Sequence, residues 1–247
     1  MKRPKPKLAV LSGWGVSPLF LETQLADFDQ LFDLQFLEIP DLKAGRSLST
    51  KERSDELLSQ IAPGSYLLGW SLGGAIAIDL AAYAPNTLAG VVTLATNPCF
   101  VAQSDWPGMD AQTFADFNEA YKSSPEKTLQ RFASLQVTGA DNPRAQLRQL
   151  KAALLPPQAP LDQLLQLLQV DRRASLRQLS CPVLALLGDA DALVPVSLAE
   201  MLTNSLSAYP RLEVACIANS SHLLFQDQPQ AVLQRIKAWL AAPGESS

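Results

Sequence analysis

The stretch "SYLLGWSLGGAIAIDLAAYAP", residues 65–85, joins a short apolar run to a longer one through a turn of glycine and serine. The first run, residues 65–70, has the length and composition of a buried strand. The second run, residues 73–84, has the length of a helix and stops before Pro85, which cannot continue one. We therefore predict a strand, a sharp turn at Ser71 and a buried helix.

The same order of short apolar runs and helical segments extends to both sides of this stretch. Further strands are predicted within residues 7–15, 34–40, 88–97, 182–189 and 212–219, and further helices within 47–61 and 228–242. Because the apolar runs lack strict alternation, they indicate a mostly parallel sheet that is covered by helices on both faces. The predicted fold class is α/β.

Residues 98–179 break this rhythm, because they contain helical segments and no run typical of a strand. The segments are "AQTFADFNEAYK", "PEKTLQRFASLQ", "PRAQLRQLKAALL" and "PLDQLLQLLQ". We predict a helical cap inserted between two strands of the sheet. Residues 1–97 and 180–247 then form the core domain, and residues 98–179 form the cap.

Composition and charge exclude several classes of protein. The chain of 247 residues has 47% hydrophobic and 18% charged residues, which is typical of a globular protein. Its net charge of −4 favours neither nucleic acid nor an anionic membrane as a partner, and no apolar stretch reaches the roughly 18 residues that span a bilayer. Three widely spaced cysteines, Cys99, Cys181 and Cys216, argue against a disulfide framework or a zinc site and fit a reducing compartment. We expect a soluble cytoplasmic protein.

Ser71 is the central residue of a Gly-x-Ser-x-Gly pattern that begins at Gly69 and ends at Gly73. Between a strand and a helix, this pattern is typical of a nucleophilic serine on a strained turn. A serine hydroxyl needs a base to take its proton, and His222 is the single histidine of the chain. His222 follows the last predicted strand, at the edge of the sheet where α/β proteins form their active sites. These residues predict Ser71 as nucleophile and His222 as general base.

The base in turn needs a carboxylate that orients the imidazole and stabilises its charged form. Asp189 and Asp191 both come at the end of the strand predicted within residues 182–189, and both lie between Ser71 and His222 in the sequence. From position alone, either aspartate suits the role.

These residues resemble the α/β-hydrolase superfamily, which places serine, aspartate and histidine in this order. Its pattern Gly-x-x-Asp-x-x-Val-Pro is matched by residues 188–195 and favours Asp191 as the acid. More narrowly, the chain resembles the pimeloyl-acyl-carrier-protein methyl ester esterases of biotin synthesis, the BioH family. The matching segments run along nearly the whole chain and are "GWG" (13–15), "GRS" (45–47), "GWSLGG" (69–74), "NPCF" (97–100), "DWPGM" (105–109), "RFASLQ" (131–136) and "SSHLLF" (220–225).

The resemblance implies a serine carboxylesterase that cleaves the methyl ester of pimeloyl-acyl-carrier protein to pimeloyl-acyl-carrier protein and methanol. Ser71 attacks the ester carbonyl, His222 moves the proton and Asp191 holds the imidazole. This chemistry requires no metal ion and no redox cofactor. The same triad also serves a general short-chain carboxylesterase or an acyl thioesterase, so small esters remain candidate substrates.

The resemblance also assigns residues around the reacting atoms. It implies an oxyanion hole from the backbone N–H groups of Trp14 and Leu72. The implied substrate-binding residues are Trp14, Leu72, Phe132 and Gln136. One departure is Ser12, which stands where the family usually has histidine and belongs to the loop that shapes the oxyanion hole.

Two pairs of basic residues lie four positions apart in the predicted cap helices, Lys127 with Arg131 and Arg144 with Arg148. This spacing puts the two members of each pair on one helical face. In an acidic protein, such a concentration of positive charge favours an acidic partner. An acyl-carrier protein is strongly acidic, and in the family similar cap positions bind it. We therefore predict that these four residues bind the acyl-carrier protein that holds the pimeloyl methyl ester.

Overall fold

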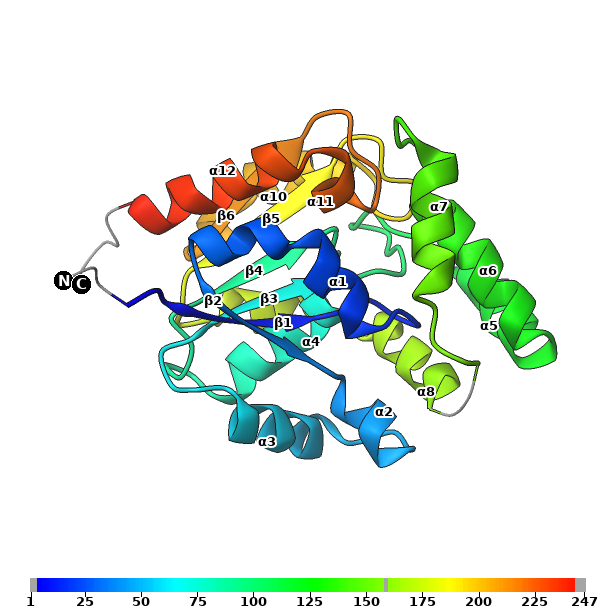
Figure 1. Ribbon diagram of the computed structural model, residues 1–247, viewed down its shortest axis with the longest axis horizontal. Helices are drawn as coiled ribbons and strands as arrows, with labels where there is room; N and C mark the ends of the chain where they lie inside the picture. The colour runs from blue at the N-terminus through cyan, green and yellow to red at the C-terminus, as the bar shows by residue number, and fades with distance from the viewer. Residues whose placement is uncertain (1–3, 158–159, 243–247) are drawn as a thin grey trace.

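The computed structural model describes residues 4–157 and 160–242, and six strands form one sheet within them (Figure 1). The strands are β1 (Lys7–Leu11), β2 (Asp33–Leu37), β3 (Tyr66–Trp70), β4 (Gly90–Leu94), β5 (Val183–Gly188) and β6 (Leu212–Ile217). Their order across the sheet is β2-β1-β3-β4-β5-β6, and every neighbouring pair is parallel. The predicted α/β class and parallel sheet are confirmed.

Helices connect the strands and cover both faces of the sheet. They are α1 (Pro18–Gln24), α2 (Pro40–Ala44), α3 (Thr50–Gln60), α4 (Leu72–Tyr83), α5 (Ala111–Ser123), α6 (Pro125–Gln136), α7 (Pro143–Ala152), α8 (Leu161–Gln166), α9 (Arg173–Arg177), α10 (Ser197–Asn204), α11 (Leu224–Asp227) and α12 (Pro229–Ala241), with short 3₁₀ turns η1 (Ala26–Gln30), η2 (Leu167–Gln169) and η3 (Leu206–Ala208). The sequence did not predict α1, α2, α9, α10 or α11, since each is too short for its apolar period to stand out.

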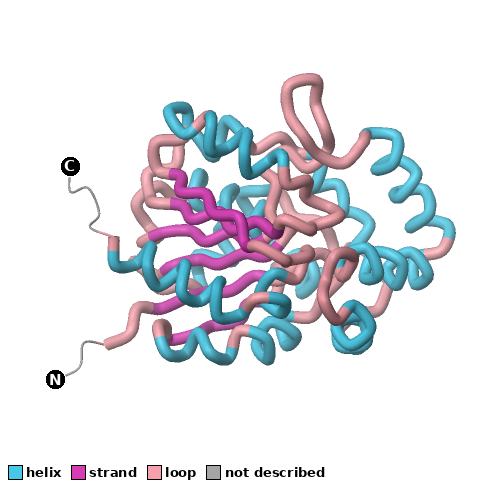
Figure 2. The backbone as a smooth tube through the Cα atoms, turned by 90° about the horizontal axis from the view of Figure 1, so that it is seen from above, coloured by secondary structure: helices cyan, strands magenta, loops and turns pink. Residues whose placement is uncertain are grey.

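Alternate residues of each strand enter the two halves of the core. Ala9 and Leu11 of β1 share one apolar cluster with α3 and α4, whereas Leu8 and Val10 share the other with α1 and α12. The tube in Figure 2 shows helices lying alongside the strands of the sheet. Helix α4 is buried around most of its circumference, because the sheet covers one side while α3, α9 and η2 pack on the other.

The chain between β4 and β5 carries helices α5 to α9, and α5, α6 and α7 lie together at one end of the molecule (Figure 1). Within the described part of residues 98–179, strand-like pairing is limited to isolated bridges such as the one between Val101 and Met109. The division into a core domain and a cap domain stays a prediction. None of the described helices is long and apolar enough to cross a membrane.

Trp14 joins the loop after β1 to the cap helices. It is 1% exposed, and its indole Nε1 donates a hydrogen bond of 2.7 Å to the carbonyl of Leu161 in α8. Its ring packs edge-on against Phe132 of α6, and against Phe117 and Tyr121 of α5, with centroids 5.1 to 5.7 Å apart. The backbone at the carboxyl end of β1 is therefore held in place by the cap.

Candidate active site

Ser71 occupies a strained turn between β3 and α4. Its backbone has φ 55° and ψ −118°, a conformation that residues other than glycine rarely adopt. The neighbouring glycines have no room for a side chain. A Cβ atom at Gly69 would lie 2.3 Å from the carbonyl group of Gly73, and one at Gly73 would lie 2.4 Å from the carbonyl oxygen of Leu11. This crowding explains the glycines of the Gly-x-Ser-x-Gly pattern, and the turn presents Ser71 at the start of a helix.

Thr96 ties this turn to β4. Its Oγ1 donates hydrogen bonds of 3.1 Å to the carbonyls of Ser71 and Leu94, and the N–H of Ser71 donates to the same carbonyl of Leu94 at 2.9 Å. The Thr96 side chain is buried. It therefore helps to hold the backbone of Ser71 in its strained conformation.

Replacing Thr96 by valine should remove these hydrogen bonds without changing the volume of the side chain. We expect the free energy of unfolding to fall by about 1 kcal/mol, and kcat for a small ester to fall several-fold because the turn relaxes. Thermal unfolding and steady-state kinetics check this, and Thr96→Ser, which keeps the hydroxyl, should retain wild-type kcat. Equal losses of kcat in both variants would contradict the role of the hydroxyl.

His222 and Asp191 form a buried pair. Nδ1 of His222 lies 2.8 Å from Oδ2 of Asp191, and the His222 side chain is 1% exposed. The other oxygen of Asp191 accepts hydrogen bonds from the N–H groups of Leu193 and Val194, at 2.8 and 3.0 Å. These bonds fix the carboxylate so that Oδ2 faces the imidazole.

Asp189, the alternative acid, has a different contact. Its Oδ1 accepts a hydrogen bond of 3.1 Å from the N–H of Ser220, two residues before the histidine. Asp189 therefore braces the loop, and of the two aspartates only Asp191 contacts the His222 ring within the described residues. This geometry favours Asp191 as the acid.

The Nε2 atom of His222 is buried and has no hydrogen-bond partner within the described residues. Because Nδ1 is bound by Asp191, Nε2 is the nitrogen that is free to accept a proton. The indole Nε1 of Trp70 donates to the carbonyl of His222 at 3.0 Å and so fixes the backbone of this residue. Trp70 itself is fully buried beside the histidine and belongs to the apolar core.

Two backbone N–H groups suit an oxyanion hole. Leu72 is the first residue of α4, so its N–H has no acceptor inside the helix. Within the described residues, neither this N–H nor that of Trp14 donates a hydrogen bond to the backbone or to a side chain. Nearby, Ser12 is 2% exposed, and its Oγ has no hydrogen-bond partner in the same part of the chain. The residue that departs from the family pattern is thus buried at the edge of the site.

Two other buried titratable groups, the Cys99 thiol and the Tyr121 phenol, stay protonated at neutral pH. Burial raises the pKa of the Cys99 thiol, and the negative charge of Asp171 raises it further. Burial raises the pKa of Tyr121, which packs on Trp14, to about 12. Neither side chain provides a thiolate or a phenolate that would compete with Ser71 or His222.

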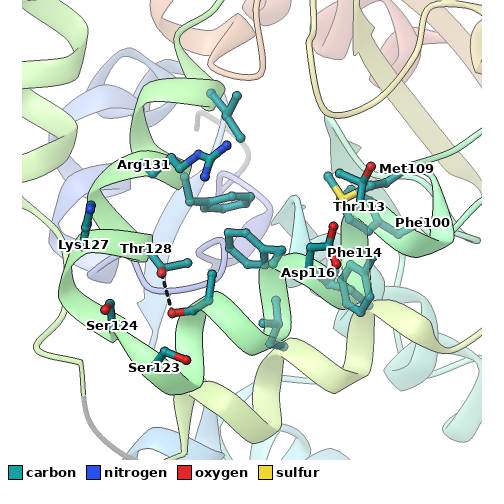
Figure 3. A pocket seen from close by; sticks show the side chains of 16 residues that line it. Phe100, Met109, Thr113, Phe114, Asp116, Ser123, Ser124, Lys127, Thr128 and Arg131 are labelled. Atoms are coloured by element: carbon teal, nitrogen blue, oxygen red, sulfur yellow. Dashed lines mark hydrogen bonds between the residues drawn. The ribbon is translucent and has the colours of Figure 1, made fainter.

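A cavity of about 460 Å³ lies among the cap helices (Figure 3). Its apolar walls include Phe100, Phe114, Phe117, Phe132, Leu165 and Leu168. Lys127 and Arg131 line it from α6, and Asp116 lines it from α5. Ser71 and His222 are not among its lining residues. Phe132 nevertheless connects it to the site, since the same ring packs on Trp14 with centroids 5.4 Å apart.

The four residues predicted to bind substrate have different surroundings. Trp14 and Leu72 are fully buried at the ends of β1 and of the serine turn, and Phe132 separates Trp14 from the cavity. Gln136 lies one turn of α6 after Phe132, is 1% exposed, and its Nε2 has no hydrogen-bond partner within the described residues. A buried amide without a partner suits a polar group of a bound ligand.

The basic pairs predicted from spacing lie on neighbouring helices. Lys127 and Arg131 are exposed on α6, and Arg144 and Arg148 are exposed on α7, which packs beside α6 (Figure 1). Within residues 4–157 and 160–242, none of the four forms a salt bridge. Their charges are therefore available to a partner.

Sequence reasoning missed three polar residues that support His222. Ser221, Asp227 and Gln146 form a hydrogen-bonded chain from α7 to the loop between β6 and α11. This loop, residues 218–223, carries His222 and is called the histidine loop below. Gln146 lies 81 positions away from Asp227 in the sequence. Neither residue belongs to a recognisable motif, so no signal in a single sequence points to the contact.

Comparison with known proteins identifies the family. Residues 11–235 match the sequence model of the alpha/beta hydrolase family. The pimeloyl-[acyl-carrier protein] methyl ester esterase of Serratia marcescens is 32% identical over 95% of this chain and 94% of that protein. The protein of the same name from Nitrosomonas europaea is 33% identical over 91% of this chain and 92% of that protein.

Solved structures agree in fold. An esterase from Exiguobacterium antarcticum superposes with a TM-score of 0.79 over 96% of this chain and 92% of its own, at 16% identity. A bromoperoxidase from Bacillus anthracis superposes with a TM-score of 0.78, at 21% identity and over 96% and 93% of the two chains. At these identities the likeness shows the fold alone, whereas the sequence matches extend over nearly the whole chain. The chain therefore belongs to the alpha/beta hydrolase family, beside relatives named pimeloyl-[acyl-carrier protein] methyl ester esterase.

Proposed function

We propose that this protein is a serine carboxylesterase that hydrolyses the methyl ester of pimeloyl-acyl-carrier protein and acts in biotin biosynthesis. The observation that carries the proposal is the buried pair of His222 and Asp191, together with a serine on a strained turn. These features occur in a chain that matches, over nearly its full length, relatives named pimeloyl-[acyl-carrier protein] methyl ester esterase.

The geometry suits acyl transfer through a covalent intermediate. Ser71 attacks the ester carbonyl while Nε2 of His222 takes the hydroxyl proton, and Asp191 stabilises the imidazolium through Nδ1. The N–H groups of Trp14 and Leu72 bind the oxyanion that forms on the carbonyl oxygen. His222 then gives its proton to the methoxide that leaves as methanol. Water repeats these steps on the acyl-enzyme and releases the free carboxylic acid.

The cap supports a carrier-protein substrate. Lys127 and Arg131 lie at the cavity and Arg144 and Arg148 on the next helix, so an acidic carrier protein meets four exposed cations beside an apolar cavity. The apolar walls suit an acyl chain. We place the protein in the cytoplasm, because its cysteines are free, which fits a reducing compartment.

A general short-chain carboxylesterase or an acyl thioesterase is the second candidate. It uses the same triad and needs no carrier protein. The observation that favours it is that Ser71 and His222 are not among the residues that line the cavity, so the reacting groups lie outside the space that the carrier-linked proposal assigns to the acyl chain.

Reversing two charges of the cap should separate these candidates. In wild type, methanol release from the carrier-linked methyl ester should exceed that from a free short-chain methyl ester. The double variant Arg131→Glu/Arg144→Glu should lower kcat/KM for the carrier-linked ester by about 10-fold or more, because attraction to the acidic partner becomes repulsion. Its ratio of carrier-linked to free activity should fall accordingly.

A matched reversal far from the cap is the control. Arg211 precedes β6 and Lys237 lies on α12, and both side chains are exposed. The variant Arg211→Glu/Lys237→Glu changes the net charge equally and should keep the preference for the carrier-linked ester. If wild type cleaves both esters alike and neither double variant changes the ratio, the protein is a generalist esterase. If Ser71→Ala retains activity, the proposed nucleophile is wrong.

A further inference from the structure

Helix α7 is hydrogen-bonded to Asp227 of α11, and Asp227 in turn binds Ser221 in the loop that carries His222. Nε2 of Gln146 in α7 donates to Oδ1 of Asp227 at 2.6 Å. The other oxygen of Asp227 accepts two hydrogen bonds from Ser221, one from its N–H at 2.7 Å and one from its Oγ at 2.6 Å. Since Ser221 directly precedes His222, two side chains connect α7 to the backbone of the general base.

Three glutamine side chains form a second connection beside this one. Nε2 of Gln226, in α11, donates to Oε1 of Gln149 in α7 at 2.7 Å and to Oε1 of Gln24 in α1 at 2.8 Å. Gln146 and Gln149 are three residues apart, so they belong to one face of α7. That face is directed at α11, the short helix that directly follows the loop carrying His222.

The carboxyl end of α7 is bound to the loop between β1 and α1, residues 12–17, which carries Trp14 and is called the oxyanion loop below. The N–H of Ser17 donates to the carbonyl of Ala153 at 2.9 Å, and the N–H of Leu155 donates to the carbonyl of Gly15 at 2.8 Å. Val16 and Leu154 form an isolated bridge between these two hydrogen bonds. Gly15 directly follows Trp14, whose N–H is assigned to the oxyanion hole.

We propose that α7 fixes the position of the loop that carries His222, residues 218–223, relative to the loop that carries Trp14, residues 12–17. We call this role of α7 the brace, and we propose that Gln146 and Asp227 are positioning residues for His222. This inference rests on the proposed function, because it takes Ser71, His222 and the N–H of Trp14 as the reacting centre. The amino-terminal half of α7 binds Asp227, which anchors the histidine loop. The carboxyl end of the same helix binds the oxyanion loop. The separation of base and oxyanion hole is thereby fixed by a rigid element.

The chemistry of the contacts explains why their loss matters. Asp227 is half-buried, and its carboxylate receives three hydrogen bonds from two residues. Without Gln146, one carboxylate oxygen loses its donor, and without the Asp227 carboxylate the Ser221 backbone loses its anchor. The imidazole is still bound to Asp191, but the loop backbone gains freedom to rotate it, and a shift of about 1 Å at a reacting group costs up to 10²-fold in rate.

The brace also relates the cap surface to catalysis. Arg144 and Arg148 are exposed on α7, while Gln146 of the same helix is buried against the histidine loop. A carrier protein that binds these arginines rests on the helix that holds the catalytic loops. Docking on this surface therefore leaves the geometry of base and oxyanion hole intact, because the helix cannot move without breaking the hydrogen bonds to Asp227 and Gly15.

The test uses Gln146→Leu and Asp227→Leu in the full-length chain, with a free short-chain p-nitrophenyl ester as substrate, because leucine at position 227 removes both oxygens that bind Gln146 and Ser221. We expect kcat to fall roughly 10- to 100-fold while KM stays within about twofold, because the positions of catalytic groups change and the ester-binding walls do not. The matched control is Gln130→Leu, which makes the same replacement at an exposed position of α6 and should keep the wild-type kcat.

A pH profile distinguishes positioning from a general loss of packing. Gln146→Glu sets a second carboxylate against Asp227, and two adjacent carboxylates bind a shared proton more readily as the pH falls. The shared proton restores the hydrogen bond. The ratio of Gln146→Glu activity to wild-type activity should therefore rise from pH 8 to pH 5. A ratio that stays constant over this range contradicts the positioning role.

Labelling of Ser71 by a fluorophosphonate makes the outcome independent of the natural substrate. Its rate depends on base activation of Ser71 and should fall in Gln146→Leu and Asp227→Leu, with Gln130→Leu unchanged. Wild-type labelling rates and kcat in both variants would overturn the brace, whatever their melting temperatures. If either variant does not fold, Gln149→Ala, which alters only the exposed member of the contact face, should slow labelling several-fold, and unchanged labelling would overturn the brace. Wild type that is labelled but does not cleave the carrier-linked ester would contradict the proposed function alone.

Discussion

Replacing Asp191 by asparagine should lower kcat for ester hydrolysis by about 10⁴-fold. Oδ1 of Asp191 accepts hydrogen bonds from two backbone N–H groups, those of Leu193 and Val194. In the variant only the amide oxygen can accept these bonds, so the NH₂ group must face Nδ1 of His222. Nδ1 then becomes the acceptor and Nε2 carries the hydrogen. An imidazole in this tautomer cannot take the proton of Ser71.

Asp189→Asn is the matched control for this prediction. Its Oδ1 accepts a bond from the N–H of Ser220, which an amide oxygen can also accept, so kcat should stay within a few-fold of wild type. Steady-state kinetics with a free ester measure both variants, and circular dichroism verifies that they fold. A large loss in Asp189→Asn with little loss in Asp191→Asn would assign the acid to Asp189 instead.

The sequence predicted most of the fold because its signals are local. Each strand is a short apolar run, and α4 follows a glycine turn and ends near a proline, so neighbouring residues alone specify these elements. Short helices such as α1 and α11 carry too few residues for a period. Their positions depend on packing against β1 and α12, which no local pattern encodes.

The candidate site likewise contains residues that local sequence patterns predict and residues that only tertiary packing brings together. Ser71 and His222 were predicted as nucleophile and base because one lies in a motif and the other is the only histidine of the chain. The choice between Asp189 and Asp191 needed a family pattern, and the geometry supports that choice through the contact with Nδ1. The contact between Gln146 and Asp227 depends on the cap helix packing on the histidine loop, and this is a property of tertiary structure alone.

The parts of the site come from distant segments of the chain and meet because parallel strands end at one edge of the sheet. Trp14, Ser71 and His222 follow β1, β3 and β6, and Asp191 follows β5. Close packing at this edge is therefore part of the chemistry. One close approach is between Gly73 and the end of β1, where the turn at Ser71 touches the start of the loop that leads to Trp14.

Replacing Gly73 by alanine should disrupt both the turn at Ser71 and the loop that leads from β1 to Trp14. The added Cβ would lie 2.4 Å from the carbonyl oxygen of Leu11 and 2.7 Å from that of Ser12, and these are backbone atoms that cannot rotate away. Either the serine turn or the loop that leads to Trp14 must shift. We expect kcat to fall at least about 100-fold and the free energy of unfolding to fall by about 2 kcal/mol.

Gly45→Ala separates this steric effect from backbone strain. Gly45 has φ 65°, and a Cβ atom added there would meet no other atom within 4 Å. Alanine at this position therefore costs about 1 kcal/mol of conformational strain and should leave kcat unchanged. Chemical denaturation and kinetics of both variants measure the difference. If Gly73→Ala loses stability but keeps kcat, the oxyanion loop does not depend on its contact with the serine turn. A loss of kcat at nearly wild-type stability would mean that the added methyl group displaces the catalytic groups while the core remains packed.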